Sequence, residues 1–395
     1  MNIGIDARFI LRPMRGMPLY VMRLCQWLPR VTDKHNFFYF INESFEHNAP
    51  KQEYVARMSE LAKLPNVKII NHNDDAEILW EQIYLPRMLK RHKIDILHMP
   101  ANRISFTTRI PIVVTLHDII DRPSLSFRDI KSSCSLLKPR QTQFFLRQNM
   151  YKRLQYEFGF KRAHKIITVS NYSASDIVNG LNISGEKIVV IYHGSDIDFL
   201  NKPPIPFSKR QHMLVLGGNV YHKNLEGAIN SWLLVPENIK ERFPLKIVGF
   251  LKNARPQILA LLSDDKVKKY VTVSGWISDA ELINNFQTAA AFMLLSYSEG
   301  FGFPLLHAME AGTPIVASNV ASIPEVLGNV GLKCAPDDHI QISRNITALL
   351  TNNELWEEQV SLGQERVSTF SWHSSALKHL DVYEDVFGQK GIGNK

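Results

Sequence analysis

One stretch in the second half of the sequence has residue types that suit the binding of a diphosphate. An apolar run, Ala290–Leu295, predicts a buried strand, and Gly300 and Gly302 favour a tight turn after it. Pro304 suits the first turn of a following helix, because its missing N–H has no intrahelical partner there. A glycine turn and a helix N-terminus present backbone N–H groups and the positive end of a helix dipole to one point. This arrangement favours a bound anion; the alternative is an ordinary connection between a strand and a helix.

Two charged residues are candidates to act at this point. Glu299 precedes the glycine turn, and its carboxylate would repel a phosphate, so we expect it to accept hydrogen bonds from hydroxyls of an attached sugar. Lys223 follows a predicted strand, His212–Gly218, and opens a predicted helix, Leu225–Trp232. A lysine there adds positive charge to the positive end of the helix dipole, and a bound anion would offset that cost. Taken alone, Lys223 could equally be an exposed loop lysine.

The surrounding segments alternate between strand and helix patterns, which is typical of parallel α/β sheets. A predicted strand, Asn2–Phe9, leads through a loop with Gly16 to a predicted helix, Leu19–Leu28. Gly16 either lets the backbone approach a ligand or only makes the turn. Further strands are predicted at Phe37–Ile41, Val67–Ile70, Asp95–Pro100, Ile112–Asp118, His164–Ser170, Lys187–Tyr192, Lys246–Phe250 and Val271–Gly275.

Two histidines lie at the ends of predicted strands, His98 and His117. Open α/β sheets bind ligands at the carboxyl ends of their strands, so both residues are placed where chemistry can occur. We expect His98 to be structural. His117, with Asp118 beside it, is a candidate for hydrogen bonding to a hydroxyl or exchanging a proton with it near neutral pH.

The length of 395 residues predicts two domains, because it exceeds what one hydrophobic core usually serves. The proline-rich stretch Asn201–Pro206 is typical of a linker, so we expect one domain in residues 1–200 and a second from residue 201. Three widely spaced cysteines without a Cys-x-x-Cys pair argue against a disulfide framework or a zinc knuckle. No signal peptide or membrane-spanning apolar run is evident in the sequence. We therefore expect a cytoplasmic protein, soluble or peripheral on a membrane.

Positive charge is concentrated in the first half of the chain. Residues 1–200 contain 28 Lys and Arg against 19 Asp and Glu, whereas residues 201–395 contain 18 against 19. Such a surface attracts nucleic acid, an anionic membrane or an acidic substrate, and without a nucleic-acid-binding motif nucleic acid is the weakest of the three. The segment Pro123–Phe160 is basic and aromatic. It is either a surface helix that dips toward a membrane interface or a helix whose rings pack in the core.

An Asp-x-Asp motif, Asp196–Asp198, precedes the linker. Paired carboxylates of this kind hold a divalent metal in some sugar-transfer enzymes. Because no other carboxylate cluster lies nearby in the sequence, we favour a solvated loop. We expect neither a metal nor another cofactor.

Short motifs along the whole chain form a specific combination. The stretch Tyr297–Pro304 is followed by Ala308-Met309 and Gly312–Ser318, and further motifs are Ile3–Arg8, Thr115–Asp118, Ile167–Ser170, Ile188–Ile191 with Gly194, Lys223-Asn224, Pro324–Val326 and Phe370–Trp372. Together they resemble glycosyltransferase family 4, retaining enzymes of the GT-B fold that use nucleotide sugars. The resemblance implies an α/β protein with two facing Rossmann-like doubly wound domains, 1–200 on the acceptor side and 201–372 binding the donor. It also implies a helix from about Ser375 to Phe387, within a tail of residues 373–395, that crosses back onto the first domain.

The resemblance implies roles for individual residues. In the family, the glutamate matching Glu299 contacts donor sugar hydroxyls, the lysine matching Lys223 binds the diphosphate, and the histidine matching His117 lies beside the sugar on the acceptor side. These three are the candidate catalytic residues. The donor site would be completed by Gly16, Gly218, Trp276, Ile277, Gly300, Phe301, Gly302, Phe303 and His307. The resemblance implies no metal. The residues agree with this, since a fixed lysine and helix-terminal amides can stabilise the leaving diphosphate without a cation.

The sequence departs from the family pattern at two of these positions. The second glutamate of the family's paired motif falls on His307, and that glutamate usually receives the ribose hydroxyls. An imidazole can still make one such hydrogen bond, so we expect a weakened or altered nucleotide preference rather than loss of activity. Glu310 could substitute, although it is rotated away from that helix face. Gly218 stands where many members have an arginine beside the lysine, and the smaller fixed charge bears on the rate; His222 could compensate.

The reaction implied by the resemblance transfers a hexose-type sugar, for example mannosyl, from a nucleoside diphosphate to an acceptor hydroxyl with retained configuration. No residue is an obvious covalent nucleophile, so we favour same-face attack with the leaving phosphate as base. The basic first domain suits a lipid-linked or polyanionic glycan at the inner membrane surface, as in assembly of lipopolysaccharide or another bacterial surface polysaccharide. Two rival functions are a nucleotide-sugar epimerase of the same fold, and a non-catalytic member that binds nucleotide or a partner transferase.

Overall fold

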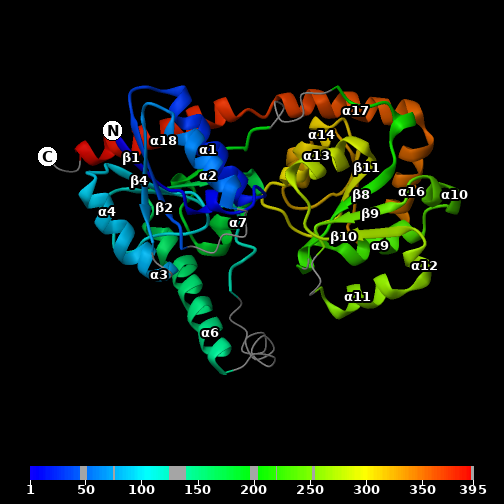
Figure 1. Cartoon of the computed structure of the whole chain (residues 1–395), viewed down its shortest axis with the longest axis horizontal. Coiled ribbons are helices and arrows are strands. Elements are labelled where there is room, and N and C mark those ends of the chain that lie inside the picture. Colours follow the sequence, from blue (N-terminus) through cyan, green and yellow to red (C-terminus); the bar gives the residue numbers. More distant parts are fainter. Residues whose placement is uncertain are drawn as a thin grey trace. The chain divides into compact units, whose positions relative to one another are not determined.

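The computed structural model describes residues 1–44, 51–73, 76–123, 139–195, 203–218, 220–250 and 254–392. The chain divides into two compact units (Figure 1). The first unit combines Met1–His193 with Trp372–Lys395, and the second unit is Gly194–Ser371. The C-terminal segment therefore returns to the first unit, and its helix α18 (Trp372–Ile392) is longer than the predicted one.

The described part of the first unit contains one parallel sheet of seven strands, in the order β3-β2-β1-β4-β5-β6-β7. In this sheet Ile3 lies opposite Phe37 on one side and Ile96 on the other. The order reverses between β1 and β4, which defines the switch point at which such sheets bind ligands. The strands are β1 (Asn2–Asp6), β2 (Asn36–Asn42), β3 (Val67–His72), β4 (Ile96–Met99), β5 (Ile112–Thr115), β6 (Lys165–Thr168) and β7 (Ile188–Val190).

Helices pack against this sheet because a parallel sheet needs both faces covered. Ser170 caps α7, since its Oγ accepts a hydrogen bond from the Ser173 N–H at 3.0 Å. The helical segments are η1 (Arg8–Leu11), α1 (Met17–Val31), α2 (Lys51–Ala62), α3 (Glu77–Leu79), η2 (Trp80–Tyr84), α4 (Leu85–Arg91), α6 (Pro139–Leu154), η3 (Gln155–Gly159), η4 (Phe160–Arg162), α7 (Asn171–Leu181), η5 (Gly185–Lys187) and α18.

The basic and aromatic segment that starts at Pro123 is divided between core and surface. Residues 124–138 lie outside the described ranges. Of the remainder, Tyr151, Tyr156 and Phe160 are buried in the first unit, whereas Phe158 is exposed. Core packing therefore explains some of the aromatic rings but not all of them.

The described part of the second unit contains a six-stranded parallel sheet in the order β10-β9-β8-β11-β12-β13. Its strands are β8 (His212–Leu216), β9 (Leu245–Val248), β10 (Val271–Ser274), β11 (Ala289–Leu294), β12 (Ile315–Ser318) and β13 (Leu332–Cys334). Its helical segments are η6 (Phe207–Lys209), η7 (Tyr221–Lys223), α9 (Leu225–Leu233), α10 (Glu237–Arg242), α11 (Pro256–Ser263), α12 (Asp265–Lys268), α13 (Asp279–Thr288), α14 (Phe303–Glu310), α15 (Ile323–Leu327), α16 (His339–Thr351) and α17 (Asn353–Ser368). The strand order is that of the Rossmann fold, with the switch point between β8 and β11.

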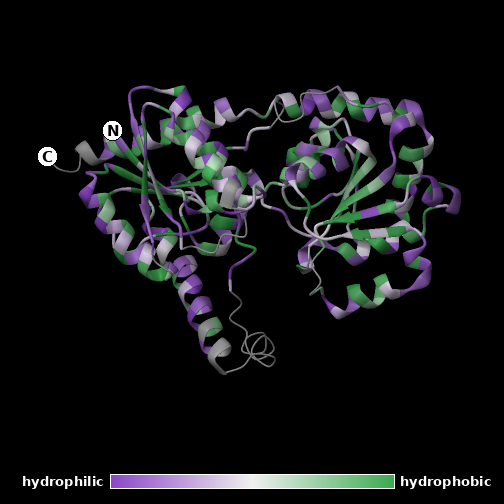
Figure 2. Cartoon of the chain, viewed as in Figure 1, coloured by the Kyte–Doolittle hydropathy of each residue, from purple (hydrophilic) through white to green (hydrophobic). Residues whose placement is uncertain are grey.

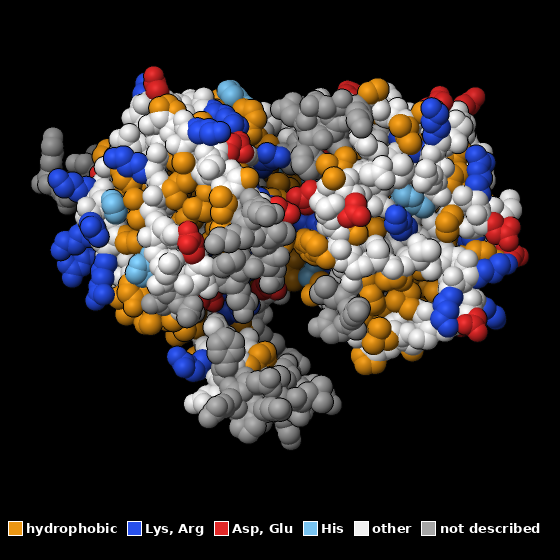
Figure 3. All heavy atoms as spheres, in the orientation of Figure 1, with side chains coloured by type: hydrophobic (Ala, Val, Ile, Leu, Met, Phe, Trp, Pro, Cys, Tyr) orange, Lys and Arg blue, Asp and Glu red, His pale blue; other side chains and the backbone are white. Residues whose placement is uncertain are grey.

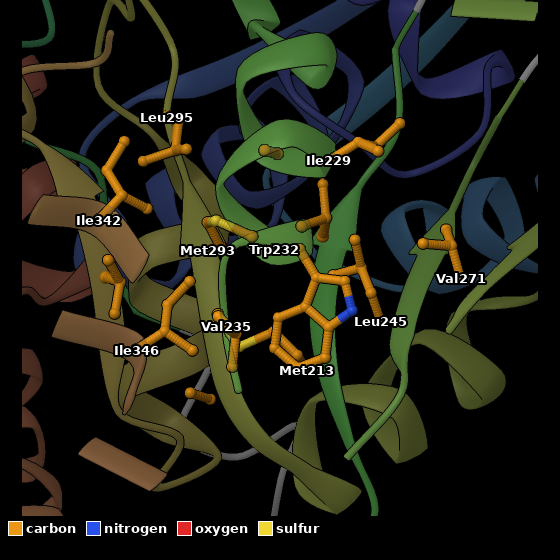
Figure 4. Packing of buried hydrophobic residues seen from close by; sticks show 14 of the residues in the cluster. Met213, Ile229, Trp232, Val235, Leu245, Val271, Met293, Leu295, Ile342 and Ile346 are labelled. Atoms are coloured by element: carbon orange, nitrogen blue, oxygen red, sulfur yellow. The ribbon is translucent and has the colours of Figure 1, made fainter. Parts of the chain in front are cut away.

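The core of the second unit forms where helices meet the apolar strands, which are mostly hydrophobic in Figure 2. Trp232 of α9 packs among Met213, Leu245 and Ile229, as Figure 4 shows. Burial of side chains of this size stabilises a fold by about 1.5–3 kcal/mol each relative to leaving them exposed. This packing fixes α9, whose N-terminal end lies next to Lys223 in the chain.

Candidate active site

The two charged candidates follow neighbouring strands at the switch point of the second unit. β8 and β11 are hydrogen-bonded neighbours, and the strand order reverses between them. Lys223 ends η7 after β8, and Glu299 lies in the turn after β11. Since both strands run parallel, both residues lie at the carboxyl edge of the sheet, where α/β proteins bind their ligands.

Lys223 and Glu299 form an ion pair, with Nζ 2.7 Å from Oε1. The Lys223 side chain is 29% exposed and the Glu299 side chain 10%. An ammonium has three N–H donors, and Lys223 uses one of them on Glu299. The remaining donors can therefore reach an anion while the carboxylate stays in place.

Glu299 is fixed by serines from two strand ends. Ser296 donates its hydroxyl hydrogen to Oε1 at 2.6 Å, and Ser322 donates to the Glu299 backbone carbonyl at 2.8 Å. Ser318 in turn donates to the Ser296 carbonyl at 2.6 Å. Oε2 makes no hydrogen bond to a described residue, so it can accept one from a hydroxyl of a ligand. These serines are not among the site residues identified from the sequence. The one local signal for them is that a polar residue at the end of an apolar strand can contribute to a binding site.

The glycine turn and α14 complete this edge of the sheet. Gly302 precedes α14 with a φ of +94°, which favours glycine, and an added Cβ would lie 3.1 Å from Leu305 Cδ1. Phe303 begins the helix, as the sequence predicts to within one residue. Gly300 and Phe301 are buried, so the turn is tightly held. The N-terminal end of α14 thus follows directly after Glu299 and favours negative charge.

Arg210, which sequence reasoning did not single out, holds the far ends of two helices. Its Nη1 donates to the carbonyls of Gln287 and Ala289 at the end of α13, at 2.7 and 3.0 Å, and its Nη2 donates to the Gly312 carbonyl after α14 at 2.6 Å. Burial lowers the pKa of Arg210 to about 10, so it remains a cation at neutral pH. A cation at helix C-terminal ends is favourable, and here it fixes the position of α14. These contacts link segments about a hundred residues apart, which no local pattern reveals.

His307 lies on α14 among aromatic rings. Its ring stacks on Phe303, with centroids 6.4 Å apart and an interplanar angle of 26°. Phe286 of α13 meets it edge-on, with centroids 5.8 Å apart. Glu310, considered above as a substitute, is buried on the same helix. The position of the family's second glutamate therefore presents a half-buried imidazole.

Trp276 and Ile277, two of the expected donor-site residues, follow the edge strand β10. Gly249 donates its N–H to the Gly275 carbonyl at 3.0 Å, which joins this loop to the end of β9. Trp276 is 57% exposed, and Ile277 is half-buried. Both residues lie at the carboxyl edge of the same sheet as Lys223, two strands away from β8.

Gly218 lies against the stem of Lys223. A Cβ added at Gly218 would be 3.2 Å from Lys223 Cγ. An arginine at this position, as in many family members, would require the lysine stem to move by a few tenths of an ångström. Because Gly218 has no side chain, the Lys223 stem can occupy this space and its Nζ can reach Glu299.

Gly16 and His117 belong to the first unit. Gly16 precedes α1 with φ 61° and ψ −128°, a combination that is open to glycine and closed to most other residues. It is exposed, and nothing lies within 4 Å of the position of an added Cβ. The turn itself therefore requires this glycine.

His117 follows β5 and is held from two directions. Its backbone N–H donates to Asn102 Oδ1 at 2.7 Å, and its Nε2 lies 3.0 Å from the Pro100 carbonyl. A carbonyl can only accept, so Nε2 carries the proton and Nδ1 has the lone pair. Burial lowers the pKa of His117 to about 4. The geometry thus supports hydrogen bonding to a ligand hydroxyl, and not proton exchange near neutral pH.

Beneath His117, a chain of hydrogen bonds joins α1, β4, β5 and α18. His379 Nδ1 donates to the Ser375 carbonyl at 2.7 Å, so its Nε2 accepts from the Tyr20 hydroxyl at 2.8 Å. Thr115 then donates to the Tyr20 oxygen, also at 2.8 Å. The Tyr20 ring meets His117 edge-on, with centroids 4.8 Å apart. The imidazole of His117 therefore rests on a ring that α18 helps to hold.

The same chain continues to His98. Its Nε2 donates to Thr115 Oγ1 at 2.8 Å, and its Nδ1 accepts from the Tyr383 hydroxyl of α18 at 2.6 Å. His98 is fully buried, which confirms the expected structural role. The donors and acceptors along this series of hydrogen bonds are consistent only while His98 and His379 are both neutral.

Among the residues that the structure describes, no three His, Cys, Asp or Glu side chains are grouped as metal ligands. The motif Asp196–Asp198 lies outside the described ranges. No helix within those ranges has the length and apolar content to span a bilayer.

The fold and the site define a class: two Rossmann-like units, one with a lysine–glutamate pair at its switch point, form a GT-B glycosyltransferase. Comparison with protein families agrees. The model described as "Glycosyltransferase Family 4" matches residues 14–199, and the model described as "Glycosyl transferases group 1" matches residues 196–366. The chain belongs to glycosyltransferase family 4 and is a glycosyltransferase.

Individual relatives are similar over parts of the chain. O-antigen chain mannosyltransferase B of Escherichia coli is 26% identical over 275 residues, which are 67% of this chain and 71% of that protein. O-antigen chain mannosyltransferase RfbU of Salmonella typhimurium is 30% identical over 192 residues, which are 48% of this chain and 52% of that protein. The structure of Anabaena Alr3699/HepE in complex with UDP and glucose superposes with a TM-score of 0.66, at 15% identity, covering 98% of this chain and 100% of that one. At that identity the superposition shows the fold alone.

Proposed function

We propose that this glycosyltransferase moves a hexose-type sugar, with mannosyl as the leading candidate, from a nucleoside-diphosphate donor to a glycan or lipid-linked hydroxyl. The names of the two similar proteins support mannosyl transfer in O-antigen synthesis, and hence assembly of a bacterial surface polysaccharide. The observation that carries the proposal is the Lys223–Glu299 pair at the carboxyl edge of the second sheet. The pair supports the proposal because an ammonium suits a diphosphate and a carboxylate suits sugar hydroxyls.

The reaction breaks the bond between the sugar's anomeric carbon and the diphosphate oxygen. The acceptor oxygen forms its bond on the same face, which retains the configuration, and the acceptor's proton passes to the leaving phosphate. Negative charge grows on the diphosphate during this step, and Lys223 and the N-terminal end of α14 are suited to stabilise it. A fixed lysine and a helix end need no reorganisation as the charge develops, so no metal is part of this proposal.

Glu299 would orient the sugar rather than transfer a proton. Oε1 of Glu299 is occupied by Lys223 and Ser296, which leaves Oε2 for sugar hydroxyls. His117, in the first unit, is neutral, and its Nδ1 can accept a hydrogen bond from a ligand hydroxyl. Positioning of this kind lowers the barrier by fixing the reacting groups in advance.

The proposed site of action is the inner face of the cell membrane, where lipid-linked acceptors are extended. The excess of positive charge in residues 1–200 supports this location, because the cytoplasmic leaflet is anionic. A lipid-linked or polyanionic acceptor would be attracted by the same charge.

The test is incubation with a panel of nucleotide sugars, each with and without a lipid-linked glycan acceptor. Nucleotide release and the mass of the glycan are measured together, and NMR of the product gives the anomeric configuration. The proposal predicts acceptor-dependent release with one hexose donor and a product of retained configuration. A changed sugar without an acceptor would instead indicate an epimerase, and an inverted linkage would contradict the proposed mechanism.

A further inference from the structure

The helix α6 and the turn η3 carry a stripe of exposed apolar side chains. We define the α6 stripe as Leu146, Met150, Leu154 and Phe158, which are 42%, 63%, 44% and 66% exposed. Residues four apart lie on one face of an α-helix, with a small rotation at each step. η3 is a wider turn with i→i+5 hydrogen bonds, and it rotates Phe158 back toward the line of the other three. The four side chains therefore share one face.

The opposite face of this segment is anchored in the first unit by buried polar contacts. Tyr151 donates its hydroxyl hydrogen to Glu81 Oε2 at 2.5 Å and accepts from Gln82 Nε2 at 2.6 Å. Gln155 also donates to Glu81 Oε2, at 2.9 Å. These bonds fix the rotation of the helix. The outward direction of the α6 stripe is therefore built into the fold, and Figure 1 shows α6 projecting from its unit.

The surface around the α6 stripe is strongly basic. Residues 145–162 contain five Lys and Arg and a single acidic residue, Glu157. Glu157 is already paired with Arg122, at 2.7 Å. Arg147 and Arg153 are exposed, and the helical repeat places one on each side of the stripe. Figure 3 shows apolar and basic side chains together on the projecting part of this unit.

These observations select one occupant among the possible partners. A second copy of the chain would bring the same cations against themselves, because a two-fold interface matches each patch with itself. An anionic bilayer surface offers negative headgroups to the arginines and an acyl boundary to the apolar side chains. Arginine stems also lie along apolar surface while their charged ends reach the headgroups.

We infer that the α6 stripe, with Arg147 and Arg153 beside it, docks the protein on an anionic lipid bilayer. The helix would lie in the plane of the interface with its apolar face in the headgroup region. This inference deepens the proposed function. It rests on that function only for the reason why the protein docks, which is access to a lipid-linked acceptor. Binding itself requires neither donor nor acceptor.

The test is flotation of the full chain with two kinds of vesicle, phosphatidylglycerol with phosphatidylethanolamine and phosphatidylcholine alone. The apolar variant is Met150→Ser with Phe158→Ser, and the charge variant is Arg147→Glu with Arg153→Glu. The control is Ile340→Ser, which removes an equally exposed apolar side chain, 60% exposed, from α16 of the second unit. All substitutions are at the surface, where effects on stability are typically within about 0.5 kcal/mol.

We expect the wild type and Ile340→Ser to float with the anionic vesicles, less at high salt, and hardly at all with phosphatidylcholine. The apolar and charge variants should each reduce binding by about tenfold or more, since apolar burial and electrostatic attraction both contribute to binding. Equal binding of all variants, or no binding by the wild type, would overturn the inference. A wild-type dimer that Met150→Ser with Phe158→Ser converts to a monomer would assign the stripe to a second copy instead. Donor cleavage with a soluble acceptor analogue, measured in parallel, reports on the proposed function separately.

Discussion

The Lys223 ammonium lies 2.7 Å from Glu299 Oε1, although the two residues are 76 positions apart and follow different strands. The switch point of a doubly wound sheet brings them together, because β8 and β11 are neighbours with separate connections. In the proposed function, this pair joins diphosphate binding to sugar recognition. The carboxylate that would repel a diphosphate is next to a cation that would attract it.

Ser296 should be needed to position Glu299. Ser296→Ala removes the hydrogen bond to Oε1, so we expect kcat/KM to fall by about tenfold and unfolding free energy by about 1 kcal/mol. The matched control is Ser263→Ala, because Ser263 is exposed and its hydroxyl donates to the Leu259 carbonyl of its own helix. Steady-state kinetics and urea unfolding measure both effects. Unchanged kcat/KM in Ser296→Ala would show that Glu299 does not depend on this anchor.

Arg210 should contribute strongly to the stability of the second unit. Arg210→Met leaves the carbonyls of Gln287, Ala289 and Gly312 without their donor, so we expect a loss of about 3 kcal/mol. Arg344→Met removes an exposed arginine of α16 in the same unit and should change stability by less than about 0.5 kcal/mol. Urea unfolding of the three proteins compares them. Equal midpoints for the two variants would contradict the role assigned to Arg210.

Buried histidines should make the first unit sensitive to acid. Burial lowers the pKa of His117 and His379 to about 4 and that of His98 and His193 well below the ordinary value. In the unfolded chain a histidine has a pKa of about 6.5. Between about pH 6.5 and 4 the unfolded state therefore binds more protons, so stability is complete above this window and falls as the pH decreases through it.

The measurement is the urea midpoint of the wild type and of His379→Gln from pH 7.5 to pH 5. His379→Gln removes one of the lowered groups, so its stability should depend less steeply on pH, even if it is lower at pH 7.5. A wild-type midpoint that does not fall toward pH 5, or an equal slope in the variant, would show that these groups do not control acid stability.

Gly16 should be required for its backbone conformation and not for lack of space. Gly16→Ala imposes a side chain at φ 61° and ψ −128°, and we expect a cost of about 1–3 kcal/mol. Gly185→Ala is the control, because an added Cβ there is equally unobstructed and the φ is not in the left-handed region. Thermal unfolding of both variants makes the comparison. Two equally stable variants would remove the argument that the α1 turn needs glycine.

Local patterns in the sequence predict much of the fold and the centre of the site. The run before Gly300, the glycine turn and Pro304 each carry a local signal, because strand, turn and helix start depend on nearby residues. Glu299 and Lys223 can be identified as candidate site residues because each is a charged residue that follows a predicted strand.

The remaining contacts depend on packing between distant segments. Ser322 contacts Glu299 across 23 residues, and Arg210 contacts Gly312 across 102. The chain from His98 to Tyr383 spans 285. Residues of this kind have no local pattern, so their roles emerge only when the sheets are assembled. The exposure of the α6 stripe is also a result of packing, since it depends on which side of this helical segment forms hydrogen bonds to Glu81.

The measurement that tests the central claim most directly is acceptor-dependent nucleotide release by the wild type, Lys223→Ala and Lys268→Ala. Lys268 is a more exposed lysine of the same unit, paired with Asp265 on α12. If Lys223 stabilises the leaving diphosphate, Lys223→Ala should reduce kcat by about a hundredfold or more, and Lys268→Ala should leave it unchanged. Equal rates for the two variants would contradict the assignment of Lys223 and Glu299 as the donor site.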